Sequence, residues 1–216
     1  MSLPPSAHLG AVTRSLTTVE RDGHSMRQLV AERTFSATAH EVWDAVTSAA
    51  RIPRWLMPVS GDLRLGGRYQ LEGNAGGEVL ACEPPRSLSV TWEFGGQVTW
   101  VDADLTESEG TTTLVLRHTA PVDPAMWDEF GPGAVGVGWE SMLLGLAQHL
   151  ADPAAEPAAD ALAALATPDG RAWFAEFMAG SSEGWVAANI VAGADPEAAR
   201  AAGERTTAAY TSEPEG

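Results

Sequence analysis

The sequence of 216 residues contains no lysine, and its 13 basic residues are all Arg. They stand against 29 acidic residues, which gives a formal net charge of −16 at pH 7. A charge of this sign and size repels a phosphate backbone, and no local group of Arg residues stands out against it. We therefore expect no nucleic acid among the partners of this protein.

Cysteine is also scarce, since Cys82 is the single one in the chain. One thiol excludes an intrachain disulfide and a metal site built from several cysteines. The five His residues are scattered, and His40 and Glu41, which are adjacent, would point in different directions on a helix. Dinucleotide, Walker, zinc-protease and nucleophile-elbow motifs are missing as well. The sequence thus predicts no metal and no cofactor.

Long apolar runs are the third absence. The longest runs, such as 142–144 and 185–188, fall far short of the roughly 20 residues that a membrane span needs. Residues 1–26 carry four charged side chains and lack the apolar core of a secretory signal. We therefore expect a cytoplasmic protein with no membrane span. With 44% apolar residues, the chain suits one domain of about 150 residues plus an appendage.

The first 60 residues carry strand, turn and helix signals. Two strand-like runs, 12–20 and 25–35, flank an Asp-Gly pair at 22–23, which predicts a hairpin. Thr38 and Glu41 have capping-box spacing and predict a helix from residue 39 to about 49. Pro53 predicts a further short turn of helix that carries Trp55.

Residues 60–119 show period-two patterning with Gly or Pro punctuation, which predicts five or six antiparallel strands. Two of these strands have a clear apolar face. The first face is formed by Leu88, Val90, Trp92 and Phe94, and the second by Leu114, Leu116 and His118. A Gly-rich loop over 131–138 is expected to lead into a helix over 139–151. The apolar stripe of that helix consists of Trp139, Met142, Leu143, Leu146 and Leu150.

A composition shift after residue 151 predicts two domains, 1–151 and an acidic helical extension over 152–216. Residues 151–166, rich in Ala, Pro and acids, are interpreted as a linker or a weak helix. Thr-Pro at 167–168 and Asp-Pro at 195–196 are typical helix starts. We expect two or three helices over 167–210, packed through Trp173, Phe177 and Trp185 on the first domain or on a second copy of the chain. The extension contains 11 acidic residues and three Arg, so its outer face should be acidic.

Five motifs between Arg33 and Ala151 carry a family resemblance. In order they read RTFSATAHEVWDAVTSAARIPRWLMP, GDLRLGGRYQL, GEVLACEPPRSLSVTWEF, DADLTESEGTTTLVLRH and GWESMLLGLAQHL. This stretch resembles the family named after the activator of the heat-shock-protein-90 ATPase, within the SRPBCC (START-like, helix-grip) superfamily. The resemblance implies an α+β helix-grip fold, in which a curved antiparallel sheet is wrapped around a long C-terminal helix. It implies less about activity, since the superfamily includes lipid carriers, cyclases, receptors and chaperone regulators.

The candidate site is the apolar space that such a fold encloses between sheet and helix. Its expected lining consists of Trp55, Leu88, Val90, Trp92, Phe94, Leu114, Leu116, His118, Trp139, Met142, Leu143 and Leu146. His118 either orients a ligand or acts as a base, or else it binds a loop carbonyl and fixes the turn. The three Trp residues among these either line the site or belong to the plain core. Glu140 lies off the apolar stripe and is interpreted as a solvated side chain.

These features favour binding of a small apolar or amphipathic molecule. A cyclase- or hydrolase-type enzyme is the alternative, and it requires His118 to face a second polar group. A chaperone or protein-interaction regulator is a third hypothesis. Chaperone contact is not expected, because nothing in residues 1–26 could form the chaperone-binding domain of the eukaryotic activator. A homodimer is left open.

Overall fold

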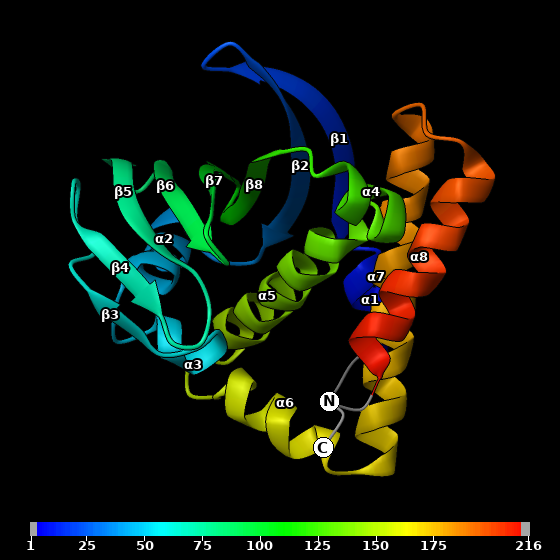
Figure 1. Ribbon diagram of the computed structural model, residues 1–216. Helices are drawn as coiled ribbons and strands as arrows, with labels where there is room; N and C mark the ends of the chain where they lie inside the picture. Colours follow the sequence, from blue (N-terminus) through cyan, green and yellow to red (C-terminus); the bar gives the residue numbers. More distant parts are fainter. Residues whose placement is uncertain (1–3, 213–216) are drawn as a thin grey trace. The chain divides into compact units, whose positions relative to one another are not determined.

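The computed structural model describes residues 4–212, and within this range the chain forms eight strands and eight helices (Figure 1). The strands are β1 (Val12–Arg21), β2 (His24–Phe35), β3 (Val59–Gly61), β4 (Arg68–Leu71), β5 (Gly76–Glu83), β6 (Ser87–Phe94), β7 (Gln97–Ser108) and β8 (Thr111–Pro121). The helices are α1 (Pro5–Leu9), α2 (Ala39–Thr47), α3 (Ile52–Trp55), α4 (Pro124–Phe130), α5 (Gly133–Ala151), α6 (Pro157–Leu165), α7 (Pro168–Val191) and α8 (Pro196–Thr211). No helix among residues 4–212 has both the length and the apolarity to cross a bilayer.

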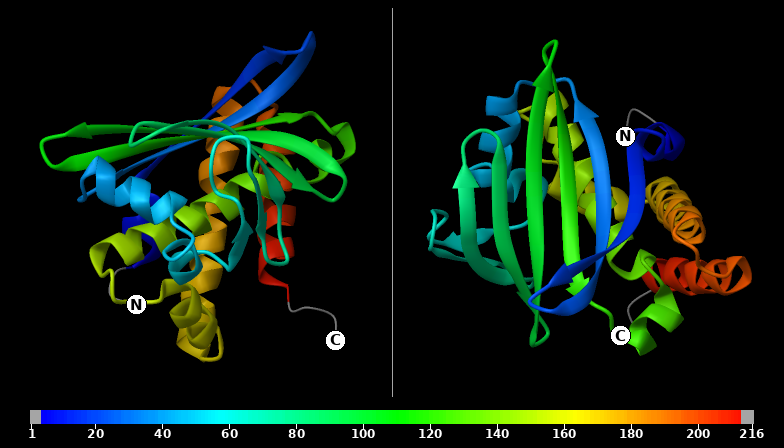
Figure 2. Two further views of the ribbon diagram at one scale, coloured as in Figure 1. Left: turned by 90° about the vertical axis from the view of Figure 1, so that its left-hand side faces the viewer. Right: turned by 90° about the horizontal axis from the view of Figure 1, so that it is seen from above.

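The strands form one antiparallel sheet, which is curved and open (Figure 2). Its strand order is β1-β2-β8-β7-β6-β5-β4-β3. The predicted α+β helix-grip class is confirmed, and β3 to β8 are the meander predicted for residues 60–119.

By its contacts the chain divides into two compact units. The strand unit comprises Glu32–Pro121 and Met142–Asp160. The flanking unit comprises the described residues of Met1–Ala31, Val122–Ser141 and Ala161–Gly216. The helix α5 is continuous and contributes its first half to the flanking unit and its second half to the strand unit. A domain boundary at residue 151 stays a prediction.

Local signals near the N-terminus produce the elements that they predict. Asp22 and Gly23 join β1 to β2 and have φ of 53° and 77°, the left-handed backbone that a type I′ hairpin turn needs. The capping box at the start of α2 is complete, since the Thr38 hydroxyl accepts the Glu41 N–H and the Glu41 carboxylate accepts the Thr38 N–H.

The predicted Gly-rich loop over 131–138 is wrong for most of its length, because α5 begins at Gly133. The glycines serve close packing inside the helix. A Cβ on Gly136 would lie 2.3 Å from the Trp185 ring, and one on Gly133 would lie 2.9 Å from the Thr206 side chain. Glycine thus lets the α7 and α8 side chains approach the α5 backbone at a separation that no other residue permits.

The C-terminal helices belong almost wholly to the flanking unit and pack within the same chain. Thr167 and Asp195 cap α7 and α8 as predicted, and these two helices, of 24 and 16 residues, agree with the two or three expected over 167–210. The helix α7 packs against α1, β1 and α8. Trp173 stacks on Phe177 at 5.5 Å between ring centroids and meets His8 of α1 edge-on at 5.9 Å. Trp185 is only 1% exposed, so burial of aromatic side chains anchors these helices.

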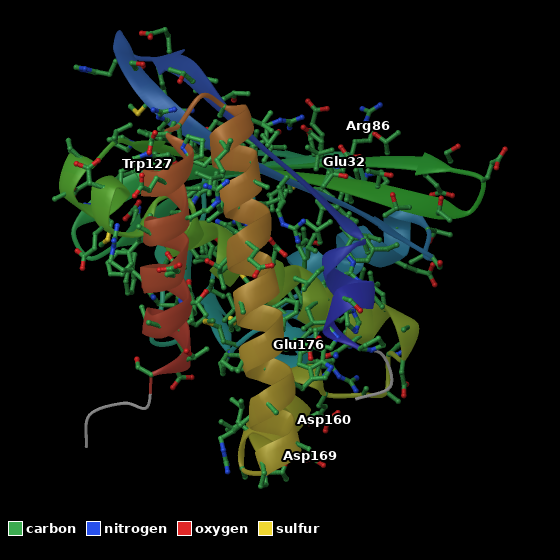
Figure 3. The ribbon with its side chains drawn as sticks, turned by 90° about the vertical axis from the view of Figure 1, so that its right-hand side faces the viewer. Glu32, Arg86, Trp127, Asp160, Asp169 and Glu176 are labelled. Carbon is green, nitrogen blue, oxygen red and sulfur yellow. The ribbon has the colours of Figure 1, made fainter. Side chains whose placement is uncertain are left out.

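The outer side of α7 is acidic, as the composition of the extension predicts. Asp169 and Glu176 are exposed on this helix (Figure 3). Residues 157–165, interpreted from sequence as linker or weak helix, form the helix α6.

The interpretation of Glu140 as a solvated side chain is wrong. Glu140 is 1% exposed, and the Arg14 guanidinium donates two hydrogen bonds of 2.6 Å to its two carboxylate oxygens. Arg14 also donates to the carbonyls of Val12 and Leu9. The carboxylate is buried because a cation with satisfied donors compensates its charge.

Candidate functional site

The strand register places the predicted apolar residues of β6 and β8 on one face of the sheet. Val90 pairs with Val101, which pairs in turn with His118. Directly paired residues in antiparallel strands project to the same side, and every second residue along each strand joins them. We call the resulting surface the site face. It is formed by Leu88, Val90, Trp92 and Phe94 of β6, Thr99, Val101, Ala103 and Leu105 of β7, and Leu114, Leu116 and His118 of β8.

Hydrogen bonds identify the site face as the side on which α2 lies. Thr112 shares the parity of the site face and donates from its hydroxyl to the Ala37 carbonyl at 2.7 Å. Glu107, its cross-strand partner, accepts the Ala39 N–H at 2.7 Å. Within the strand unit, α2, α3 and the second half of α5 all lie on one side of the strands (Figure 2). The other face carries polar groups such as the Arg117–Asp104 ion pair.

Eleven of the twelve predicted lining residues belong to the strand unit. Five are buried apolar side chains, namely Val90, Leu114, Leu116, Leu143 and Leu146. Four are partly exposed, namely Trp55, Leu88, Trp92 and Met142. Phe94, beside the β6–β7 turn, is 59% exposed. Trp139 is buried in the half of α5 that belongs to the flanking unit, one helical turn before Leu143.

A chain of hydrogen bonds crosses the site face. Nε2 of His118 lies 2.8 Å from the Thr99 hydroxyl, and that hydroxyl donates to the Trp92 carbonyl at 3.0 Å. His118 and Thr99 are both buried. Burial lowers the pKa of His118 from 6.5 to about 4, so the imidazole is neutral at pH 7. Nε2 thus contacts a side chain on the neighbouring strand. The predicted contact of His118 with a loop carbonyl stays a prediction.

Thr99 was missed at the level of sequence, although a signal for it exists. Gly95 and Gly96 both have positive φ and form the turn between β6 and β7. Counting outward from this two-residue turn pairs Trp92 with Thr99. The parity of Trp92 then places Thr99 on the face of His118.

The α3 segment is fixed against its neighbours by two contacts of Trp55. Its indole N–H donates to the Ala45 carbonyl of α2 at 3.0 Å. A Cβ on Gly145 of α5 would lie 2.5 Å from the Trp55 carbonyl oxygen, so glycine permits this close approach. These contacts hold the partly exposed ring of Trp55 beside the second half of α5.

A second buried histidine, His149, lies on α5 in the same unit. Its Nε2 accepts the Arg51 Nε–H at 3.2 Å. Burial, and then the Arg51 charge, lower the pKa of His149. The contact links α5 to the segment between α2 and α3, which is a structural role. Within residues 4–212 no three His, Cys, Asp or Glu side chains are grouped so as to hold a metal ion.

Comparisons with known proteins agree with this architecture. Residues 36–151, more than half of the chain, match the family model described as Activator of Hsp90 ATPase homolog 1-like protein. The crystal structure of CalU16 from Micromonospora echinospora is similar, with 30% identity and a TM-score of 0.65 over 82% of this chain and 98% of that one. Protein MLL2253 from Mesorhizobium loti is 27% identical, with a TM-score of 0.51 over 59% of this chain and 98% of that one. No curated protein matches the chain.

Proposed function

We propose that this chain, which belongs to the Activator of Hsp90 ATPase homolog 1-like family, binds a small apolar or amphipathic molecule against the site face. The observation that carries this proposal is the composition of that face. Apolar side chains from three strands surround one polar group on this face, in which the Thr99 hydroxyl contacts Nε2 of His118 and donates to the Trp92 carbonyl. Small-molecule sites are lined in this way, mostly apolar with few polar groups that orient the ligand.

The polarity of that chain supports binding rather than catalysis. A histidine that activates a hydroxyl must accept the hydroxyl proton. The Thr99 hydroxyl donates its proton to the Trp92 carbonyl instead. The second polar group that a cyclase or hydrolase requires is therefore present, but it is oriented against nucleophilic chemistry.

A fluorescence titration with the neutral apolar probe N-phenyl-1-naphthylamine tests the proposal. A larger side chain at Leu88, which is partly exposed on the site face, should occupy the space of the probe. The same substitution at Ser89, on the opposite face of β6, is the matched control. We expect Leu88→Trp to weaken probe binding at least about tenfold, or 1.4 kcal/mol, and Ser89→Trp to leave it within about twofold. Equal binding by both variants, with unchanged melting temperatures, would show that the probe binds elsewhere and would overturn the assignment to this face.

A further inference from the structure

Two buried polar groups of α7 make no hydrogen bond within the part of the chain that the structure describes. They are the hydroxyl of Ser181 and the indole N–H of Trp185, and across residues 4–212 neither has a partner. Ser181 is 0% exposed and Trp185 is 1% exposed, so bulk solvent does not reach them. Buried polar groups are nearly always bonded to protein or to ordered water, because an unbonded one costs free energy. These two groups therefore require a further partner.

Both side chains project from the same side of α7, because residues at i and i+4 are neighbours on a helix surface. Trp185 identifies the element that faces them. A Cβ on Gly136 of α5 would lie 2.5 Å from Nε1 of Trp185. The indole N–H thus lies against the first half of α5, and all of these residues belong to the flanking unit.

An acceptor, Glu140, lies on the same side of α5, one helical turn after Gly136. Arg14 connects it to α7, since Arg14 Nε donates to Glu140 Oε1 at 2.6 Å and would lie 2.7 Å from a Cβ on Gly184. Gly184 immediately precedes Trp185. Each carboxylate oxygen of Glu140 accepts a hydrogen bond from Arg14 and has a further lone pair. The carboxylate therefore offers acceptor capacity beside this part of α7.

We infer that Ser181, Trp185 and Glu140 form a buried site for one water molecule between α5 and α7. The chemistry of the three groups selects this ligand. The indole N–H can only donate and the carboxylate can only accept, whereas the hydroxyl does either. A metal cation cannot accept from the indole, and an anion without a proton cannot donate to the carboxylate. Water does both, and it makes the roughly three hydrogen bonds that are typical of a buried water.

A crystal structure of the full chain, at a resolution that shows ordered water, tests the site directly. We expect density for one water within about 3.2 Å of both Trp185 Nε1 and Ser181 Oγ, with Glu140 as its acceptor. Density bonded to the carboxylate but not to the indole N–H would indicate a cation and would overturn the inference. A protein partner for the indole N–H, or no density at this position, would overturn it as well.

Melting temperatures of two serine variants test the site in solution. Ser182, the next residue of α7, is 2% exposed and donates directly to the Gly203 carbonyl at 2.8 Å, so it is the matched control. We expect Ser181→Ala to lower the melting temperature by about 2 °C or more, as Ser182→Ala should, because each substitution removes a hydrogen bond of a buried hydroxyl. If the Ser181 hydroxyl is unbonded, alanine should raise the melting temperature, since it removes a polar group and favours the helix. A raised or unchanged melting temperature in Ser181→Ala therefore overturns the role of Ser181.

Discussion

Burial of His118 couples its protonation to folding. The folded-state pKa is about 4 and the ordinary value is 6.5, so between these values the unfolded chain binds a proton that the folded chain does not. The free energy of unfolding should therefore fall as the pH drops from about 6.5 to about 4, by roughly 3 kcal/mol from this residue. Urea unfolding at several pH values measures this decrease in the wild type and in His118→Gln. The other titrating groups are common to both proteins, so their contributions cancel when the two free energies of unfolding are subtracted. Identical pH profiles for the two proteins would contradict the buried neutral imidazole.

A capping box and a buried carboxylate show why single positions differ in how well the sequence predicts them. Thr38 and Glu41 were recognised because a capping box is a local device, complete within four residues. Glu140 was misinterpreted because its partner, Arg14, lies 126 positions away. An apolar position can be recognised from its neighbours along the chain, but the burial of a charge depends on whether a distant partner compensates it.

At the scale of elements, the C-terminal part of α5 was predicted as a helix, whereas its glycine-containing N-terminal part was not. The residues toward its C-terminal end follow the helical period that the sequence displays, and they were predicted. The Gly133, Gly136 and Gly138 positions suggested a loop, because glycine is unfavourable in a helix unless packing requires it. For Gly136 and Gly133 that requirement comes from Trp185 and Thr206, which no local sequence pattern connects to these glycines.

Substituting alanine for these glycines tests the packing. Gly136→Ala should lower the free energy of unfolding by about 1–3 kcal/mol, because the new Cβ would overlap the buried Trp185 ring. Gly138→Ala in the same helix is the matched control, since its Cβ would lie 3.3 Å from the Tyr210 hydroxyl oxygen. Any overlap cost there should be partly or fully offset by the higher helix propensity of alanine. Equal effects of the two substitutions in urea denaturation would contradict the close contact with Trp185.

At the scale of the whole molecule, α7 and α8 are integral to the flanking unit. Phe177 and Trp185 are buried, and two such aromatics contribute on the order of 10 kcal/mol before the entropy of ordering is subtracted. A chain that ends at Ala151 loses both and uncovers their partners on α1, β1 and the first half of α5. We expect this shorter chain to melt at a lower temperature or to aggregate through the apolar surface that it uncovers. A monomeric shorter chain with an unchanged melting temperature would contradict the account.

Native mass spectrometry of freshly purified protein tests the central claim, binding of a small apolar molecule on the site face, most directly. The account predicts a population that carries one extra small-molecule mass, released on mild activation. This population should disappear in Leu88→Trp and persist in the opposite-face control Ser89→Trp. An extra mass that persists unchanged in a folded Leu88→Trp protein would contradict the assignment of the ligand to this face. A wild-type protein that neither carries such a mass nor acquires one from added apolar compounds would contradict the binding function itself.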